Sequence, residues 1–202
     1  GKRGSRRIVG DHMLSQNDLL RGEFDDAIAI GGWPMDDHPP GGFDKADLPP
    51  AVQIRTPEVF SIPLRSLYSR NVSNLMMAGR NISASHVAFT STRVMATCAV
   101  VGQAAGTAAA QCIENGITPR QLAGDRKRVF TLRQTLLRDD QTIRNARNED
   151  PLDLARKAKV TASAENGDAR AALVIDGHLR DIPKKEVHHW EARMGGPEGA
   201  WL

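Results

Sequence analysis

The chain of 202 residues has only two cysteines and few aromatic side chains. Aromatic residues make up 4% of the sequence, which is too few for a platform on which nucleic-acid bases stack. Cys98 and Cys112 lie fourteen positions apart in one helical pattern, which separates them by about 21 Å and excludes a disulfide between them. Their alanine-rich surroundings predict buried, unreactive thiols.

The sequence also has no uninterrupted apolar run long enough to cross a membrane. The best candidate is 93–114, but threonine and glutamine interrupt it and alanine adds little transfer free energy. The formal net charge of +3 is modest, so we expect neither a membrane nor a nucleic-acid partner. No charged-then-apolar leader precedes the chain, which starts at Gly1, so we expect any targeting signal to be missing or removed.

Short apolar or β-branched segments predict four strands, and longer periodic segments predict helices. We expect strands at 6–14, 27–30, 58–63 and 75–78, with a long irregular loop at 36–50. We expect a short helix near 15–20 and further helices at 93–114, from 118 onward and at 126–138. The long helix ends at Asn115 and Gly116, and Thr118 with Gln121 forms a capping box.

Residues 75–93 form a strand, a glycine turn and the start of a long helix. Gly79 has no β-carbon, so backbone and ligand can approach closely there. A helix that begins near 91–93 has unpaired amides and about half a positive charge at its start. An anionic or electron-rich ligand group fits such a place, whereas a purely structural core helix explains the small residues equally well.

The segment LMMAGRNISASHVAFTSTRVMATCAVVGQAAGTAAA, with RRIVGDHML, FDDAIAIGGWP and IPLRSLYSRNVSN before it, resembles FAD-dependent oxidoreductases. The resemblance is to the C-terminal portion of their glutathione-reductase-like FAD-binding fold, and FAD is the cofactor that it implies. It implies that the ribityl chain is bordered by Gly79, Arg80, Asn81 and Ile82. It also implies that the flavin is approached by backbone amides near Ser91, Thr92, Arg93, Val94 and Met95.

Two departures from the family pattern qualify this resemblance. Arg80 stands where many related folds have an acidic residue, and a guanidinium only donates hydrogen bonds. Asn81 therefore supplies the acceptor, or Arg80 turns to phosphate. No G-x-G-x-x-G sequence occurs in the chain, so we expect a fragment that binds FAD weakly or not at all alone.

Composition changes after 148, where turn residues separate two further strand candidates at 160–163 and 172–175. The tail resembles the opening of a discoidin-like, galactose-binding β-sandwich. Trp190 and Trp201 are then expected to fill its core rather than to stack on a sugar. A sugar ligand favours a periplasmic or secreted protein.

The predicted fold class is α/β: the distal part of an FAD-binding Rossmann-like domain with substrate-domain strands, a helical connector and a truncated β-sandwich. We expect substrate-domain strands and the long loop in 1–70 and the FAD-binding strand, turn and helix in 71–117. We expect the connector in 118–157 and the incomplete sandwich in 158–202.

Three residues are candidates for catalysis. His38 lies beside two carboxylates in the long loop and is a candidate base, although it could equally be an exposed loop histidine. His86 lies between the glycine turn and the long helix and is a candidate for contact with substrate or flavin, or for a structural role. Arg65 is a candidate substrate anchor or a partner in a packing salt bridge. We expect no metal site, since the adjacent His188 and His189 would point to opposite faces of a strand.

We therefore expect a flavin-mediated hydride transfer from an organic, carbohydrate-related small molecule. The alternative is a non-catalytic carbohydrate-binding or adhesion module. A nicotinamide-binding Rossmann domain is disfavoured because the glycine fingerprint is missing. The sequence does not set the oligomeric state.

Overall fold

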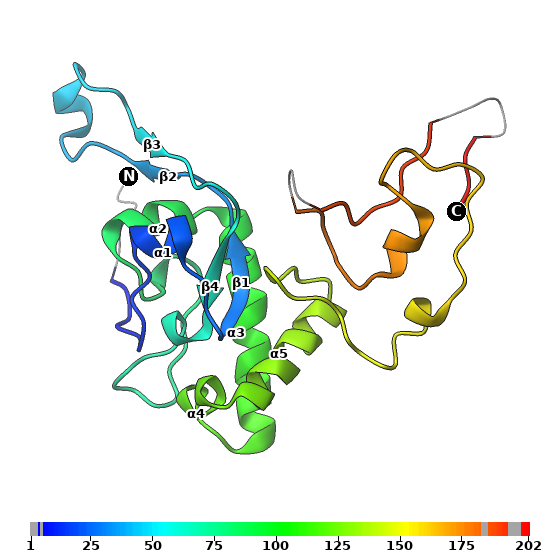
Figure 1. Cartoon of the computed structure of the whole chain (residues 1–202). Coiled ribbons are helices and arrows are strands. Elements are labelled where there is room, and N and C mark those ends of the chain that lie inside the picture. Colours follow the sequence, from blue (N-terminus) through cyan, green and yellow to red (C-terminus); the bar gives the residue numbers. More distant parts are fainter. Residues whose placement is uncertain (1–3, 5, 183–185, 194–198) are drawn as a thin grey trace.

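The computed structural model describes residue 4 and the segments 6–182, 186–193 and 199–202. The strands are β1 (Ala27–Gly31), β2 (Met35–Asp37), β3 (Val52–Ile54) and β4 (Phe60–Pro63). The α-helices are α1 (Gln16–Arg21), α2 (His86–Thr92), α3 (Met95–Asn115), α4 (Pro119–Gly124) and α5 (Arg126–Arg138). In these described segments the strands form two short antiparallel pairs, of which β1 with β4 packs among the α-helices and β2 with β3 projects from them (Figure 1).

The central strand pair is β1 with β4, and it confirms the strands expected at 27–30 and 58–63. The pairing is antiparallel, with Ala27 opposite Pro63 and Gly31 opposite Phe60. Every residue of β4 is buried, and β1 is covered by α3 and α5. Because both faces are enclosed, these strands are apolar runs without polar alternation.

The second pair, β2 with β3, forms a hairpin arm that we define as residues 35–54. The pair is only three residues long on each side and projects from the body (Figure 1). A 3₁₀ turn, Gly42–Lys45, lies within its loop, and the side chain of Phe43 there is fully exposed. All three residues of β3 are exposed, so β2 and its contacts with α2 hold the arm to the body.

Two expected strands are not formed. Residues 6–14 are extended but make only one isolated parallel bridge, Leu14 to Ala84. Residues 75–78 likewise make one bridge, between Tyr68 and Met76. The predictions were wrong because these backbone groups bond to turns rather than to a neighbouring strand: the N–H of Met77, for example, donates to Leu67.

The long helix begins later than expected because a separate short helix precedes it. Helix α2 ends where the N–H of Arg93 bonds to the carbonyl of Phe89, and Val94 is extended with ψ 149°. Helix α3 therefore starts at Met95 rather than at 91–93. Its end is as predicted: Gly116 adopts φ 62°, a conformation that favours glycine.

Helix α3 buries one face and leaves the other open. The buried residues include Val101, Ala105 and Ala108, whereas Met95 and Ile113 on the opposite face are exposed. A β-carbon added at Gly102 or Gly106 would meet no atom within 4 Å. Neither glycine therefore packs closely against another described element. No described helix is long and apolar enough to cross a membrane.

The two other helices of the body agree with their sequence signals. Thr118 caps α4 and forms the predicted capping box with Gln121, with Pro119 in the first turn. Asp125 caps α5 through the amides of its first turn. The short helix α1 is capped by Ser15, which also forms a capping box with Asp18. These caps satisfy amides that would otherwise lack partners.

The tail contains turns instead of the predicted strands. Residues 160–163 have no regular structure, and the segment expected to form a strand at 172–175 belongs to a 3₁₀ turn, Ala171–Ile175. The indole N–H of Trp190 donates to the carbonyl of Ala164, and Trp201 is exposed. Neither tryptophan fills a core here, because in the described tail only Ala169 and Ala171 are buried hydrophobic residues.

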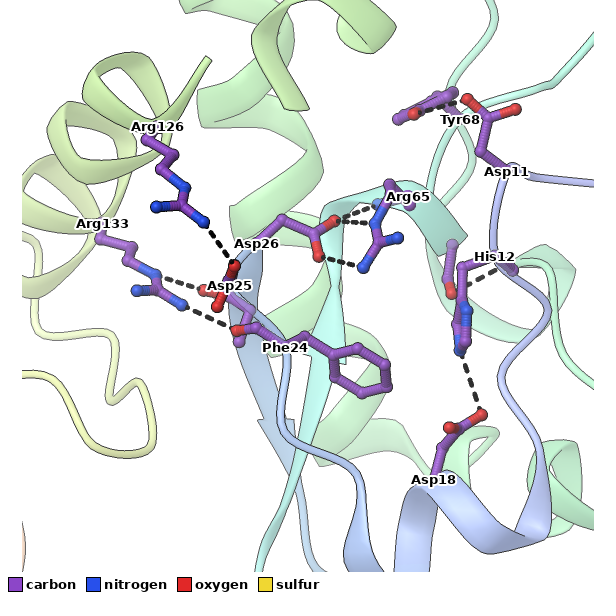
Figure 2. Close-up of polar contacts among 12 residues, drawn as sticks. Asp11, His12, Asp18, Phe24, Asp25, Asp26, Arg65, Tyr68, Arg126 and Arg133 are labelled. Atoms are coloured by element: carbon purple, nitrogen blue, oxygen red, sulfur yellow. Dashed lines mark hydrogen bonds and ion pairs between the residues drawn. The ribbon is translucent and has the colours of Figure 1, made fainter. Parts of the chain in front are cut away.

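An ion pair between the buried Asp26 and the partly exposed Arg65 joins the beginning of β1 to the end of β4. Asp26 is 3% exposed and accepts three hydrogen bonds from Arg65, one from its backbone and two from its guanidinium, at 2.9–3.1 Å (Figure 2). Arg133 of α5 donates to the carbonyls of Phe24 and Ala27 in the same region. The pair therefore connects both strands and, through the adjacent backbone, the helix that covers them.

A second polar cluster ties the N-terminal segment to α4. Asp11 accepts bonds from Arg120 at 2.6 and 2.7 Å and from the hydroxyl of Tyr68 at 2.8 Å. The hydrogen bond from Arg120 holds the pKa of Asp11 below its usual value. Burial and the nearby carboxylate raise the pKa of Tyr68, which keeps its hydroxyl a donor.

Replacing Asp26 with asparagine should lower the free energy of unfolding by about 1–2 kcal/mol, because the buried carboxylate that accepts three hydrogen bonds is lost while the half-exposed Arg65 remains solvated. Asp25→Asn is the matched control, since Asp25 is 88% exposed in its pair with Arg126 and should change stability by less than about 0.5 kcal/mol. Urea unfolding of both variants measures the difference. Equal losses would contradict the role given to the pair of Asp26 and Arg65.

The lowered pKa of Asp11 predicts a pH-dependent contribution to stability. A carboxyl whose pKa is depressed by folding stabilises the protein above its unfolded pKa, and this contribution is lost as the pH falls through the folded pKa. Asp11→Asn should therefore be less stable than wild type at neutral pH, with a gap that shrinks below about pH 4. Thermal unfolding across this range tests the prediction; a gap independent of pH would refute it.

Candidate functional site

An open cavity of about 790 Å³ lies between the hairpin arm and α2. Its walls combine apolar residues of the arm with polar residues of both elements. The histidines predicted for catalysis, His38 and His86, both border it, together with Arg93. The other lining residues are Gly4, Asp37, Pro39, Pro40, Gly42, Phe43, Lys45, Ala46, Leu48 and Pro50.

His86 is the first residue of α2, and its ring is turned toward β2. Ser85 caps the helix by accepting from the amide of Ala88. Nε2 of His86 lies 3.2 Å from Oδ1 of Asp37, and the His86 side chain is 63% exposed. The imidazole is therefore oriented by a carboxylate while remaining accessible from the cavity.

His38 is held on both ring nitrogens. Nδ1 lies 2.9 Å from the carbonyl of Pro50, and Nε2 lies 3.1 Å from Oδ2 of Asp36. Both ring nitrogens of His38 are therefore engaged by oxygen atoms of the arm. The contact with Pro50 joins the two sides of the arm.

Arg93 connects the cavity to the junction between α2 and α3. Its Nη2 donates to the carbonyl of Asp36 at 2.9 Å, and its side chain is largely buried. The guanidinium lies 5.5 Å from the ring centroid of Phe89, and that of Arg7 lies 5.0 Å from the same ring. The charge-assisted hydrogen bond to Asp36 therefore holds the end of α2 against the arm. The cation–π contact with Phe89 keeps the guanidinium on its own helix.

The glycine turn packs against the first turns of α3. Gly79 has φ +70°, and a β-carbon placed there would lie 3.8 Å from Sγ of Cys98. Arg80 is exposed, the carbonyl of Asn81 accepts from Ile8, and Ile82 is fully buried. The turn brings the four residues expected at the ribityl chain to the start of α3.

The junction between α2 and α3 contains an unsatisfied polar atom and a helix start without a side-chain cap. Thr92 is 1% exposed, and its Oγ1 has no hydrogen-bond partner. Ser91 is engaged instead, since its hydroxyl donates to the carbonyl of Trp33. Val94, the cap residue of α3, has no side-chain acceptor for the first amides, which begin with Met95. An electron-rich ligand group fits this place.

Arg65, the third catalytic candidate, does not join the two histidines. Its guanidinium is paired with Asp26, which raises the pKa of Arg65, and it does not line the cavity (Figure 2). These contacts favour the alternative of a packing salt bridge. Sequence reasoning missed the link between Asp37 and His86, which no local pattern reveals because 49 positions separate them.

The cysteines form no disulfide, and the tail histidines pair with separate carboxylates. Cys112 is buried as predicted, whereas Cys98 is only partly buried, and burial raises the pKa of both thiols. Nδ1 of His188 lies 2.6 Å from Oδ2 of Asp176, whereas Nδ1 of His189 lies 2.8 Å from Oδ2 of Asp181. The two rings therefore contact different carboxylates. Across the described residues, no group of three or more histidine, cysteine or acidic side chains is arranged to hold a metal ion.

The site thus consists of a left-handed glycine turn against the start of a long helix and a cavity bordered by two histidines. The model of the FAD dependent oxidoreductase family matches residues 1–136, and the chain belongs to this family. FAD is the cofactor that this family indicates, and oxidoreduction is its activity. No curated protein and no solved structure matches the chain at a significant level.

Gly79→Val in the complete protein should abolish retention of FAD, because valine adds bulk at the turn and is strained at φ +70°. Gly116→Val is the matched control: Gly116 has φ +62° but lies at the far end of α3. Both variants should lose about 1–2 kcal/mol of stability. The ratio of flavin absorbance to protein after purification distinguishes the two variants. Equal FAD retention in both would contradict the expected contact between Gly79 and FAD.

Proposed function

We propose that the chain transfers hydride from an organic, carbohydrate-related substrate to FAD, with the substrate in the cavity lined by His38 and His86. The observation that carries this proposal is the position of Arg93. Its side chain lines the cavity, while its backbone closes α2 immediately before the first amides of α3. A substrate in the cavity and a flavin at the junction would therefore be neighbours.

The proposed cofactor contacts are the turn from Gly79 to Ile82 and the helix junction from Ser91 to Met95. The turn supplies a close backbone approach, and Thr92 supplies a buried hydroxyl that lacks a partner. Amides at the start of α3 would stabilise negative charge on the pyrimidine edge of the flavin. When bound, FAD supplies the acceptor for the hydride.

We propose further that this chain represents the C-terminal portion of the flavin fold and that other parts of the complete protein bind the pyrophosphate. The chain has no G-x-G-x-x-G sequence. The exposed face of α3, with Met95, Ile113 and two open glycines, supports this proposal because such a surface suits close packing against another element. On this proposal, the fragment alone is inactive.

The carbohydrate part of the proposal rests on the tail. Its sequence resembles the beginning of a discoidin-like, galactose-binding sandwich, and the exposed indole of Trp201 offers a surface on which a sugar ring could stack. A module that binds sugar without catalysis would share this feature. The two functions differ in whether bound sugar reduces a flavin.

The complete gene product should purify with bound FAD and show the visible absorbance of an oxidised flavin. Anaerobic mixing with D-galactose, D-glucose or myo-inositol should bleach this absorbance as the flavin is reduced, whereas dithionite serves as the control for a reducible cofactor. A colourless protein that binds these sugars even after incubation with FAD would establish the non-catalytic alternative.

A further inference from the structure

We propose that His86 is the proton acceptor of the reaction and that His38 serves instead to hold the hairpin arm; this rests on the proposed function. The two histidines border one cavity, and each faces a carboxylate of β2. What distinguishes them is the partner of the second ring nitrogen.

The hydrogen bond to Asp37 determines which nitrogen of His86 carries the proton. An ionised carboxylate only accepts, so Nε2, at 3.2 Å from Oδ1, is the protonated nitrogen of the neutral ring. The lone pair is then on Nδ1, which has no hydrogen-bond partner among the described residues. Because the side chain is 63% exposed beside the cavity, Nδ1 is available to a substrate hydroxyl.

His38 lacks such a nitrogen. Nδ1 donates to the carbonyl of Pro50 and Nε2 faces Asp36, so neither is available as an acceptor. These two contacts instead connect Asp36 of β2 to Pro50, which lies two residues before the start of β3. His38 therefore maintains the shape of the cavity wall formed by the arm.

The assigned step is the oxidation of an alcohol to a carbonyl, with FAD as the two-electron oxidant. The hydroxyl O–H bond breaks, and its proton passes to Nδ1 of His86. The hydrogen on the same carbon leaves with both electrons of its C–H bond for the flavin, and the oxygen electrons form the C=O bond. Asp37 stabilises the imidazolium that results.

The first test determines the tautomer of His86 in the 202-residue chain without any cofactor. Nitrogen-15 correlation spectra at alkaline pH, with His86→Gln used for assignment, should place the proton on Nε2. Asp37→Ala should weaken this preference. A wild-type ring that carries its proton on Nδ1 would overturn the proposal.

The second test measures reduction of bound flavin by D-galactose, D-glucose and myo-inositol in the complete protein. His86→Gln should slow the reduction by about 10²–10⁴-fold, the usual contribution of a general base, with flavin retention unchanged. His38→Gln should mainly raise the KM, with less than about a tenfold loss of kcat, because it loosens the wall without removing the acceptor. Free imidazole should restore part of the rate to His86→Ala, an effect that a structural role would not produce.

The outcomes separate this inference from the proposed function. Wild-type rates in His86→Gln, or the larger kcat loss in His38→Gln, would overturn the assignment of His86 while leaving flavin reduction by sugar intact. A wild-type protein whose flavin none of the three compounds reduces would overturn both.

Discussion

The position of the cavity depends on the ion pair between the buried Asp26 and Arg65. The carboxylate and guanidinium fix the beginning of β1 to the end of β4, and the two strands pair from there to Gly31 and Phe60 with a register shift between Ala27 and Ala29. Only three residues then separate the end of β1 from the start of β2. The carboxylates that orient both histidines therefore derive their positions from an ion pair outside the cavity. Its cost of desolvation is offset by three hydrogen bonds.

Phe89 occupies the corresponding position on the helical side. The guanidinium groups of Arg7 and Arg93 both lie near its buried ring, and the same helix begins with His86. Two cations near one aromatic ring are tolerated because the ring quadrupole attracts both and Asp36 lies close to Arg93. The cavity and the helix junction are thus connected through about two turns of helix.

Sequence patterns predicted the elements whose signals are local. The capping box at Thr118 and the closing residue Gly116 specify helix ends through local backbone bonds. The break at Val94 was not predictable, because no proline or glycine marks it. The strand predictions at 75–78 and in the tail were wrong, because strand formation depends on pairing with residues distant in the sequence. The two histidines and the carboxylates beside His38 were identifiable from the sequence, whereas the pairing of His86 with Asp37 comes from tertiary structure.

The hairpin arm has a further consequence for the shape of the cavity. Three paired residues on each side, an exposed β3 and a fully exposed Phe43 bury little apolar surface. Such a segment can open locally at a free energy far below that of global unfolding. The cavity is already open, so entry needs no such opening; local fraying of the hairpin would instead change the shape of the wall that a bound molecule contacts, while the core stays folded.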